Sequence, residues 1–117
     1  MKINELLVEA AKTTDFTKLT TSDLFKCYAN AGYVSDSKAD AAYERKSFID
    51  SRFAGLVKGK PMYVAFCHDD NEGGYYLSRM YIEVDKDGKG KAEPEGRPFF
   101  EDESKEVVKK RFDSGAK

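Results

Sequence analysis

The residues best suited to chemistry lie close together between positions 66 and 76, in the stretch FCHDDNEGGYY. It holds the only histidine of the chain, His68, followed by the carboxylates of Asp69, Asp70 and Glu72. Imidazole and carboxylate groups serve in acid-base catalysis and in metal sites. A glycine pair then allows the backbone to reverse direction. The stretch is therefore either a reactive site or an acidic turn between two strands.

A small enzyme centred on His68 is one interpretation of this stretch. Cys27 or Ser78 is then the nucleophile and His68 its base, or His68 and Asp70 are ligands of a metal ion. Neither pattern is complete, because neighbouring side chains cannot all converge on one tetrahedral ion and the chain has no second histidine. The Gly-x-Ser-x-Gly turn of many hydrolases is also absent from the sequence. We therefore expect no cofactor and keep the enzyme as an alternative.

Alternating side chains in the stretch YYLSRMYIEV favour a binding surface instead. A strand with a period of two places tyrosines and an arginine on one face. These residue types are enriched at the energetic centres of protein interfaces, and acidic residues beside them would steer a partner. The partner that we expect is another protein. The expected contact residues are Tyr75, Arg79, Tyr81, Asp69, Asp70 and Glu72.

Single-stranded nucleic acid is the alternative partner for the same face, since bases stack on aromatic rings. The charge balance argues against it, because 20 basic and 21 acidic residues give a net charge of −1. Phosphate attraction needs a positive groove. The best electrostatic anchor is the short basic run Lys109, Lys110 and Arg111. Nucleic acid is therefore the weaker expectation.

A second acidic stretch, DKDGKGK from Asp85, has some of the pattern of a calcium-binding loop. The pattern fails at its last position, where Pro94 stands in place of the required glutamate. Asp87-Gly88 is instead the dipeptide that a tight β-hairpin prefers. We expect a hairpin turn here.

The first half of the chain predicts three helices, within a helical region spanning residues 1–58. Ile3, Leu6, Leu7 and Ala10 share one face of a short opening helix. A second helix, LFKCYANA, follows a cap at Thr20 or Thr21 and stops at Gly32. The longest predicted helix runs from about Lys38 to Ala54, with Asp36 or Ser37 as its cap and an apolar stripe of Ala41, Phe48, Ile49, Phe53 and Leu56.

The second half predicts an antiparallel β-meander over residues 61–100 and a C-terminal helix over 102–113. Strands at 62–67 and 75–84 alternate with a period of two. A third strand is short and interrupted by Pro94 and Pro98, which suits a sheet edge. Acids precede bases in the last segment, as a helix dipole favours. Residues 1–117 are therefore expected to form a single α+β domain of three N-terminal helices, about three strands and a final helix.

Composition also indicates the cellular compartment and the class of protein to which such a domain belongs. Cys27 and Cys67 lie in apolar surroundings, which predicts two buried thiols in a reducing compartment, and we expect a cytoplasmic protein. Acids interrupt the apolar stretch at the start of the chain, so no membrane association is expected. A small, tyrosine-rich domain of this kind is typical of regulators, adaptors and inhibitors, including phage accessory proteins that act on host proteins. A homodimer formed by pairing of edge strands is a further expectation.

Overall fold

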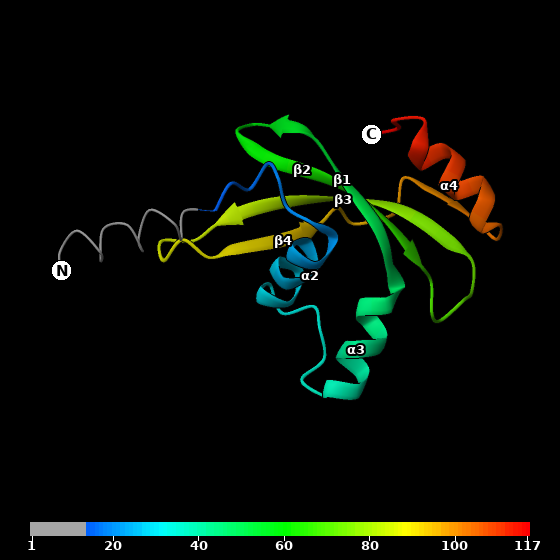
Figure 1. Ribbon diagram of the computed structural model, residues 1–117, viewed down its shortest axis with the longest axis horizontal. Helices are drawn as coiled ribbons and strands as arrows, with labels where there is room; N and C mark the ends of the chain where they lie inside the picture. Colours follow the sequence, from blue (N-terminus) through cyan, green and yellow to red (C-terminus); the bar gives the residue numbers. More distant parts are fainter. Residues whose placement is uncertain (1–13) are drawn as a thin grey trace.

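Three helices and five strands make up residues 14–117, the segment of the chain that the computed structural model describes (Figure 1). The predicted α+β class is confirmed, and the opening helix predicted around residues 3–10 lies outside the described residues. No helix within residues 14–117 is long and apolar enough to cross a membrane. The elements are α2 (Thr21–Asn30), α3 (Lys38–Ser47), β1 (Phe48–Val57), β2 (Lys60–His68), β3 (Tyr75–Val84), β4 (Gly90–Pro94), β5 (Phe100–Asp102) and α4 (Lys105–Asp113).

The strands form one antiparallel sheet in the order β1-β2-β3-β4, with β5 also paired to β3. The predicted meander is confirmed for β2, β3 and the short strands after them. Pro94 ends β4 and Pro98 precedes β5, so two short strands share the edge of β3 where one interrupted strand was predicted. Proline is tolerated there because an edge position need not donate a ladder hydrogen bond.

Each face of the sheet is covered by a helix, and the strand period decides which side chain meets which helix. Tyr63 and Ala65 point to the face where Leu24 of α2 packs. Val64 and Phe66, their neighbours on β2, point to the opposite face and α4. Figure 1 shows α2 across the middle of the sheet, α4 near the C-terminus and α3 extending from the start of β1. The apolar core is therefore split into two layers by the sheet.

The predicted start and end of α2 are confirmed. Thr20 is its N-cap, with an oxygen that accepts a hydrogen bond from the Asp23 amide, while the Asp23 carboxylate accepts from the Thr20 amide. This reciprocal pair satisfies amides that have no partner within the helix. Gly32, with φ of +92°, follows the helix in the left-handed conformation that glycine adopts freely.

The third predicted helix is wrong over its second half. Ser37 caps it as expected, but α3 ends at Ser47 and the chain continues as strand β1. The helical region proposed over residues 1–58 therefore includes a strand. Two irregularities in the pairing of β1 with β2 remove the alternation of buried and exposed residues that would have indicated a strand. In the strand, Phe48 is buried against the rings of Phe25 and Tyr28 of α2.

Strands β1 and β2 are joined by the two-residue turn Lys58-Gly59. Val57 pairs with Lys60, and both central residues have positive φ, +52° for Lys58 and +80° for Gly59. These angles define the turn whose twist matches that of the flanking strands. Lysine is an unfavourable residue at such an angle, because its Cβ crowds the following carbonyl.

Lys58→Asn is expected to raise the free energy of unfolding by up to about 1 kcal/mol, since asparagine adopts the left-handed conformation more readily. Urea denaturation of the variant and the wild-type protein measures the difference. Lys86→Asn, an exposed change in another loop, is the control and should leave the stability within about 0.5 kcal/mol of wild type. An unchanged or lower stability of Lys58→Asn would contradict the assignment of the turn.

The hairpin predicted at DKDGKGK is confirmed between β3 and β4, but it is not the two-residue turn that Asp87-Gly88 indicated. Val84 pairs with Gly90, so the loop has five residues, and only Gly88 of that dipeptide has positive φ. The Asp85 carboxylate accepts hydrogen bonds from the amides of Asp87 and Lys89. These bonds lower the pKa of the Asp85 carboxyl, the Lys89 amide making the largest contribution. The acid thus has a structural role in closing the turn.

Candidate functional site

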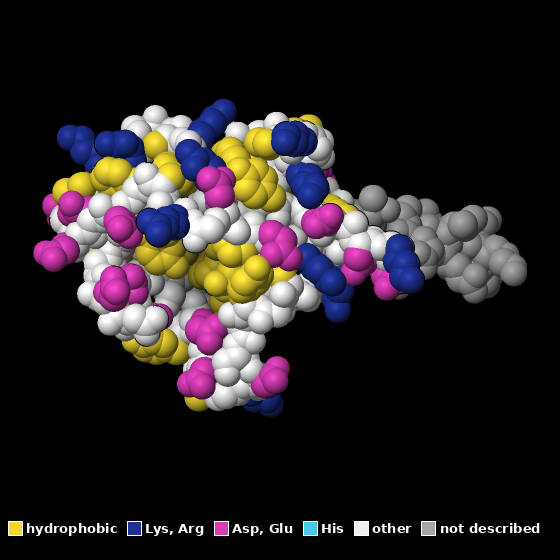
Figure 2. All heavy atoms as spheres, turned by 180° about the vertical axis from the view of Figure 1, so that it is seen from behind, with side chains coloured by type: hydrophobic (Ala, Val, Ile, Leu, Met, Phe, Trp, Pro, Cys, Tyr) yellow, Lys and Arg dark blue, Asp and Glu magenta, His cyan; other side chains and the backbone are white. Residues whose placement is uncertain are grey.

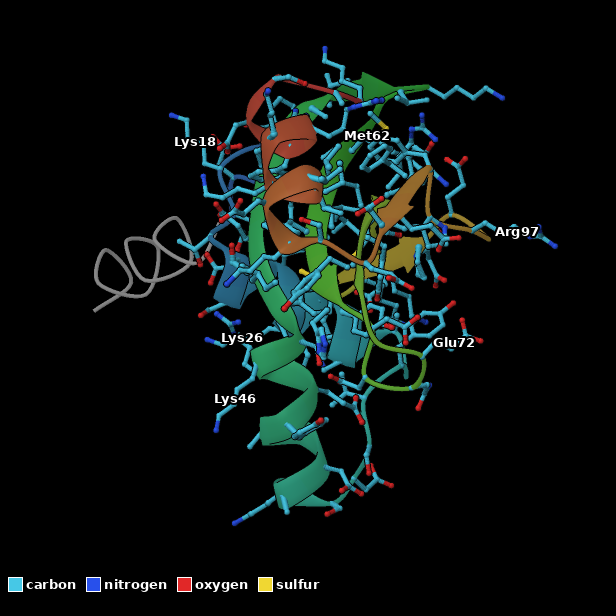
Figure 3. The ribbon with its side chains drawn as sticks, turned by 90° about the vertical axis from the view of Figure 1, so that its right-hand side faces the viewer. Lys18, Lys26, Lys46, Met62, Glu72 and Arg97 are labelled. Atoms are coloured by element: carbon cyan, nitrogen blue, oxygen red, sulfur yellow. The ribbon has the colours of Figure 1, made fainter. Side chains whose placement is uncertain are left out.

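The loop between β2 and β3, residues 69–74, is the acidic turn that its glycines predict. The Asp69 carboxylate accepts hydrogen bonds from the amides of Asn71 and Glu72. The Asp69 amide donates to the Gly74 carbonyl, and the Asp69 carbonyl accepts from the Gly73 amide. Both glycines have positive φ. Asp69 therefore organises the loop, whereas Glu72 is exposed and points away from α3 (Figure 3).

His68, at the end of β2, is joined to this loop and to α3. Its Nδ1 lies 2.9 Å from Oδ1 of Asp70, and the other oxygen of Asp70 accepts a hydrogen bond from the Ser47 hydroxyl. The imidazole also lies against the Tyr75 ring, with 5.0 Å between the centroids. The carboxylate of Asp70 thus ties the end of α3 to the end of β2.

The order of these groups does not suit nucleophilic catalysis. A triad needs the imidazole between the hydroxyl and the carboxylate, but here Asp70 lies between Ser47 and His68. Cys27 is buried, and burial raises the pKa of its thiol, whereas an attacking cysteine needs a lowered pKa. The hydrogen bond of His68 goes to Asp70. The proposed Cys27–His68 pair gains no support from this geometry.

His68 and Asp70, the alternative metal ligands, do lie together. Within residues 14–117, however, no cluster of three or more His, Cys, Asp and Glu side chains is arranged to hold a metal ion. Two ligands leave a tetrahedral or octahedral ion with most of its coordination sphere to fill from water. The pair is better described as a hydrogen-bonded link.

The aromatic sheet face proposed for partner binding packs toward α4 and is largely engaged within the molecule. Arg79 lies 4.2 Å from the centroid of the Phe99 ring and bonds to Glu95 and to the main-chain oxygen of Lys117. The Tyr81 hydroxyl donates to Glu95. Tyr75 packs on Phe66, and all three proposed contact residues are half-buried. Their exposed area is therefore smaller than a free sheet face would offer.

A cleft of about 630 Å³ opens on the other side of β3. Its walls are α3, the end of α2 with the residues after it, the loop 69–74 and the segment 94–98. Five aromatic rings line it: Tyr28, Tyr33, Tyr43, Phe48 and Tyr76. Five carboxylates also line it: Asp40, Glu44, Asp69, Asp70 and Glu95. We call this the aromatic-acidic cleft.

The charge of the cleft is of one sign. Among the described residues, His68 is the only basic side chain in its lining, and no lysine or arginine contributes to it. Lys46 of α3 points away from the loop that carries Glu72 (Figure 3). From behind, lysine and arginine side chains lie mostly along the upper edge of the molecule, whereas acidic side chains are spread over its left side, its middle and its lower part (Figure 2). The cleft is therefore suited to a cationic ligand.

The cleft unites the predicted Asp69 and Asp70 with residues that sequence reasoning did not single out. Asp40, Tyr43, Glu44 and Ser47 come from α3, where their spacing of i, i+3, i+4 and i+7 places them on one face. The spacing of these polar residues on α3 can be recognised in the sequence. The elements that form the opposite wall of the cleft depend on contacts between residues far apart in the chain.

Comparison with known proteins identifies no relative: no family model, no curated protein and no solved structure matches this chain.

Proposed function

We propose that this protein is a small protein-binding module, a regulator, adaptor or inhibitor, that holds a segment of its partner in the aromatic-acidic cleft. The observation that carries the proposal is the cleft itself, a concave surface in which five rings and five carboxylates converge. Binding sites are typically concave, with apolar walls and a few convergent polar groups. Reduced Cys27 and Cys67 are compatible with the cytoplasmic setting that we propose.

Exposed tyrosines at the rim support binding of a macromolecule. Tyr33 is 46% exposed and Tyr43 is 59% exposed, although both have large apolar rings. The Tyr33 ring is stacked on Tyr28, with 5.0 Å between centroids, so its position is already defined before a partner arrives. Rigid tyrosines contribute contact area at a small cost in conformational entropy. The rim is therefore a good candidate for the energetic centre of an interface.

Nucleic acid is disfavoured as the partner, because the carboxylates of the cleft would repel phosphate. The basic run proposed as its anchor lies on α4, away from the cleft lining. Within that run, Lys109 is paired with Asp113, and Arg111 lies over the Phe100 ring. Two of its three cations thus already have partners.

Affinity capture from the native host's lysate tests both the function and the surface. The wild-type protein should retain one stoichiometric partner, identified by mass spectrometry. Tyr33→Ala combined with Tyr43→Ala should lose it, because the rim of the cleft is removed. Tyr81→Ala, on the opposite face, is the matched control and should retain it.

Each outcome of this capture separates the alternatives. Loss of the partner on Tyr81→Ala alone would return the interface to the sheet face with Tyr75 and Arg79. Retention by every variant would remove the cleft from consideration. If the wild-type protein captures only further copies of itself, its partner is a second copy of the chain and the expected homodimer is formed. Capture of no protein at all would overturn the protein-binding function.

A further inference from the structure

We propose that the aromatic-acidic cleft receives an arginine side chain from an extended basic segment of the partner protein. This inference rests on the proposed function, because it names the chemistry of the partner at the same site. Charge complementarity selects a cation. Among cations, a guanidinium group suits the aromatic walls of the cleft, because it is planar, weakly hydrated and able to stack on aromatic rings.

Two carboxylates of α3 lack a cation among the described residues. Asp40 and Glu44 line the cleft, and neither forms an ion pair within residues 14–117. One Glu44 oxygen accepts only a long 3.4 Å hydrogen bond from the Ser35 amide. Like charges at i and i+4 of a helix repel each other, so a bound cation relieves this repulsion. A guanidinium group can serve two carboxylates at once through its fork of donors.

The other acids of the cleft are already committed within the molecule. Asp70 accepts from His68 and Ser47, and Glu95 accepts from Arg79 and Tyr81. They set the negative field of the cleft, but fewer of their oxygens are free. The direct acceptors for an incoming cation are therefore on α3.

Aromatic rings border these acceptors. Tyr43 lies between Asp40 and Glu44 in the sequence of α3 and is largely exposed, while the stacked pair Tyr28 and Tyr33 forms another side of the lining. A cation over the face of a tyrosine ring is attracted by its electron density. The flat face of an arginine guanidinium group that enters between these rings stacks on tyrosine. The N–H groups at its edge then donate hydrogen bonds to the carboxylates of α3.

The floor of the cleft offers one more acceptor. Ser78 is 5% exposed and lines the cleft, and none of the hydrogen bonds within residues 14–117 involves its hydroxyl. No completely buried polar side-chain atom in that range lacks a partner, so the Ser78 oxygen opens onto the cleft. A buried hydroxyl without a protein partner is a ready hydrogen-bond acceptor for an N–H group that reaches the floor.

Fluorescence anisotropy with defined peptides tests the inference on the full chain. The probe is a fluorescein-labelled peptide of alternating glycine and arginine. Two matched peptides carry lysine or citrulline in place of arginine, citrulline having nearly the same shape without the charge. We expect the arginine peptide to bind at least about tenfold more tightly than the citrulline peptide, with lysine between them. Affinity should fall as salt rises, since the carboxylates of α3 are solvent-accessible.

Variants of equal charge locate the binding. Asp40→Asn combined with Glu44→Gln removes the two free carboxylates and should weaken the arginine peptide by about tenfold or more. Glu103→Gln combined with Glu106→Gln removes the same charge outside the cleft and should change the affinity by less than about twofold. Thermal unfolding of each variant verifies that the fold is retained.

Equal binding of the arginine and citrulline peptides would overturn the inference, as would equal effects of the two double variants. Lysine binding as tightly as arginine would replace the guanidinium assignment by a simple ammonium site. These failures are distinct from failure of the protein-binding function. A partner lost on Tyr33→Ala with Tyr43→Ala, together with peptides that do not bind, means that the cleft is an interface but that its ligand is not basic.

Discussion

The Phe66→Ala variant is expected to lose about 3–5 kcal/mol of unfolding free energy, the usual cost of removing a buried phenyl ring. Phe66 is 2% exposed and lies between the sheet and α4, with its ring against those of Tyr75 and Phe112. Its removal leaves a cavity where α4 meets β2, and the rigid sheet cannot collapse to fill it. Since the free energy of unfolding of a small domain is only about 5–15 kcal/mol, this variant should be close to unfolding at 37 °C.

Urea denaturation followed by circular dichroism measures the loss. Phe53→Ala is the matched control, because it makes the same change on β1 at a residue that is 38% exposed. Its ring packs against Tyr63 but is only partly buried, so its cost should be less than half that of Phe66→Ala. Equal losses in the two variants would show that the layer between the sheet and α4 is not packed as described.

Alkaline pH is expected to destabilise the protein steeply between pH 9 and pH 12. Burial raises the pKa of the Cys67 thiol to about 12, against an ordinary value of 9.0. A hydrogen bond from the Tyr76 hydroxyl to the sulfur partly lowers this pKa, and the Asp70 charge raises it further. Burial also raises the pKa of the Tyr76 hydroxyl, and its bond to Cys67 adds to that rise. Both groups thus keep their protons longer in the folded state than in the unfolded chain.

The direction of the pH effect follows from proton counting. Above pH 9 the unfolded chain releases the Cys67 proton while the folded protein retains it, so rising pH favours unfolding. The stabilising contribution is complete below pH 9 and is lost as the pH rises toward 12. Each such group contributes a slope of about 1.4 kcal/mol per pH unit within its window.

Urea denaturation at a series of pH values from 8 to 11, with a reductant present, measures this slope. Cys67→Ala removes the thiol and should reduce the slope by about 1.4 kcal/mol per pH unit, whatever its own stability at pH 8. Leu56→Ala, an exposed residue, should leave the slope unchanged. The same slope in Cys67→Ala and wild type would contradict the burial of the thiol in the folded state.

The sequence predicted the elements whose signals are local. The caps Thr20 and Ser37, the existence of a hairpin turn after β3 and the acidic turn after His68 depend on hydrogen bonds or φ angles within a few residues. The two faces of β3 also followed from its period, since successive side chains of a strand point to opposite sides. Such features need no knowledge of distant segments of the chain.

The strand β1 could not be predicted in the same way. Phe48, Ile49, Phe53 and Leu56 fit a helical stripe, and the bulges of β1 hide its period of two. What stabilises the strand is its pairing with β2 and the packing of Phe48 on Phe25 and Tyr28 of α2. Tertiary contacts of this kind readily override a weak local preference for helix.

The candidate site also has a part that depends on local sequence and a part that depends on tertiary contacts. By itself, the sequence determined that residues 69–74 form an acidic turn and that tyrosines and carboxylates occur near it. Only the tertiary structure decided that Asp40 and Glu44 of α3 face that turn, and that Arg79 and Tyr81 are engaged near α4 instead. The physical reason is that turns and periodic faces are set by neighbouring residues. A cleft is set by the path of the backbone between elements far apart in the chain, and here that path depends on where α3 gives way to β1.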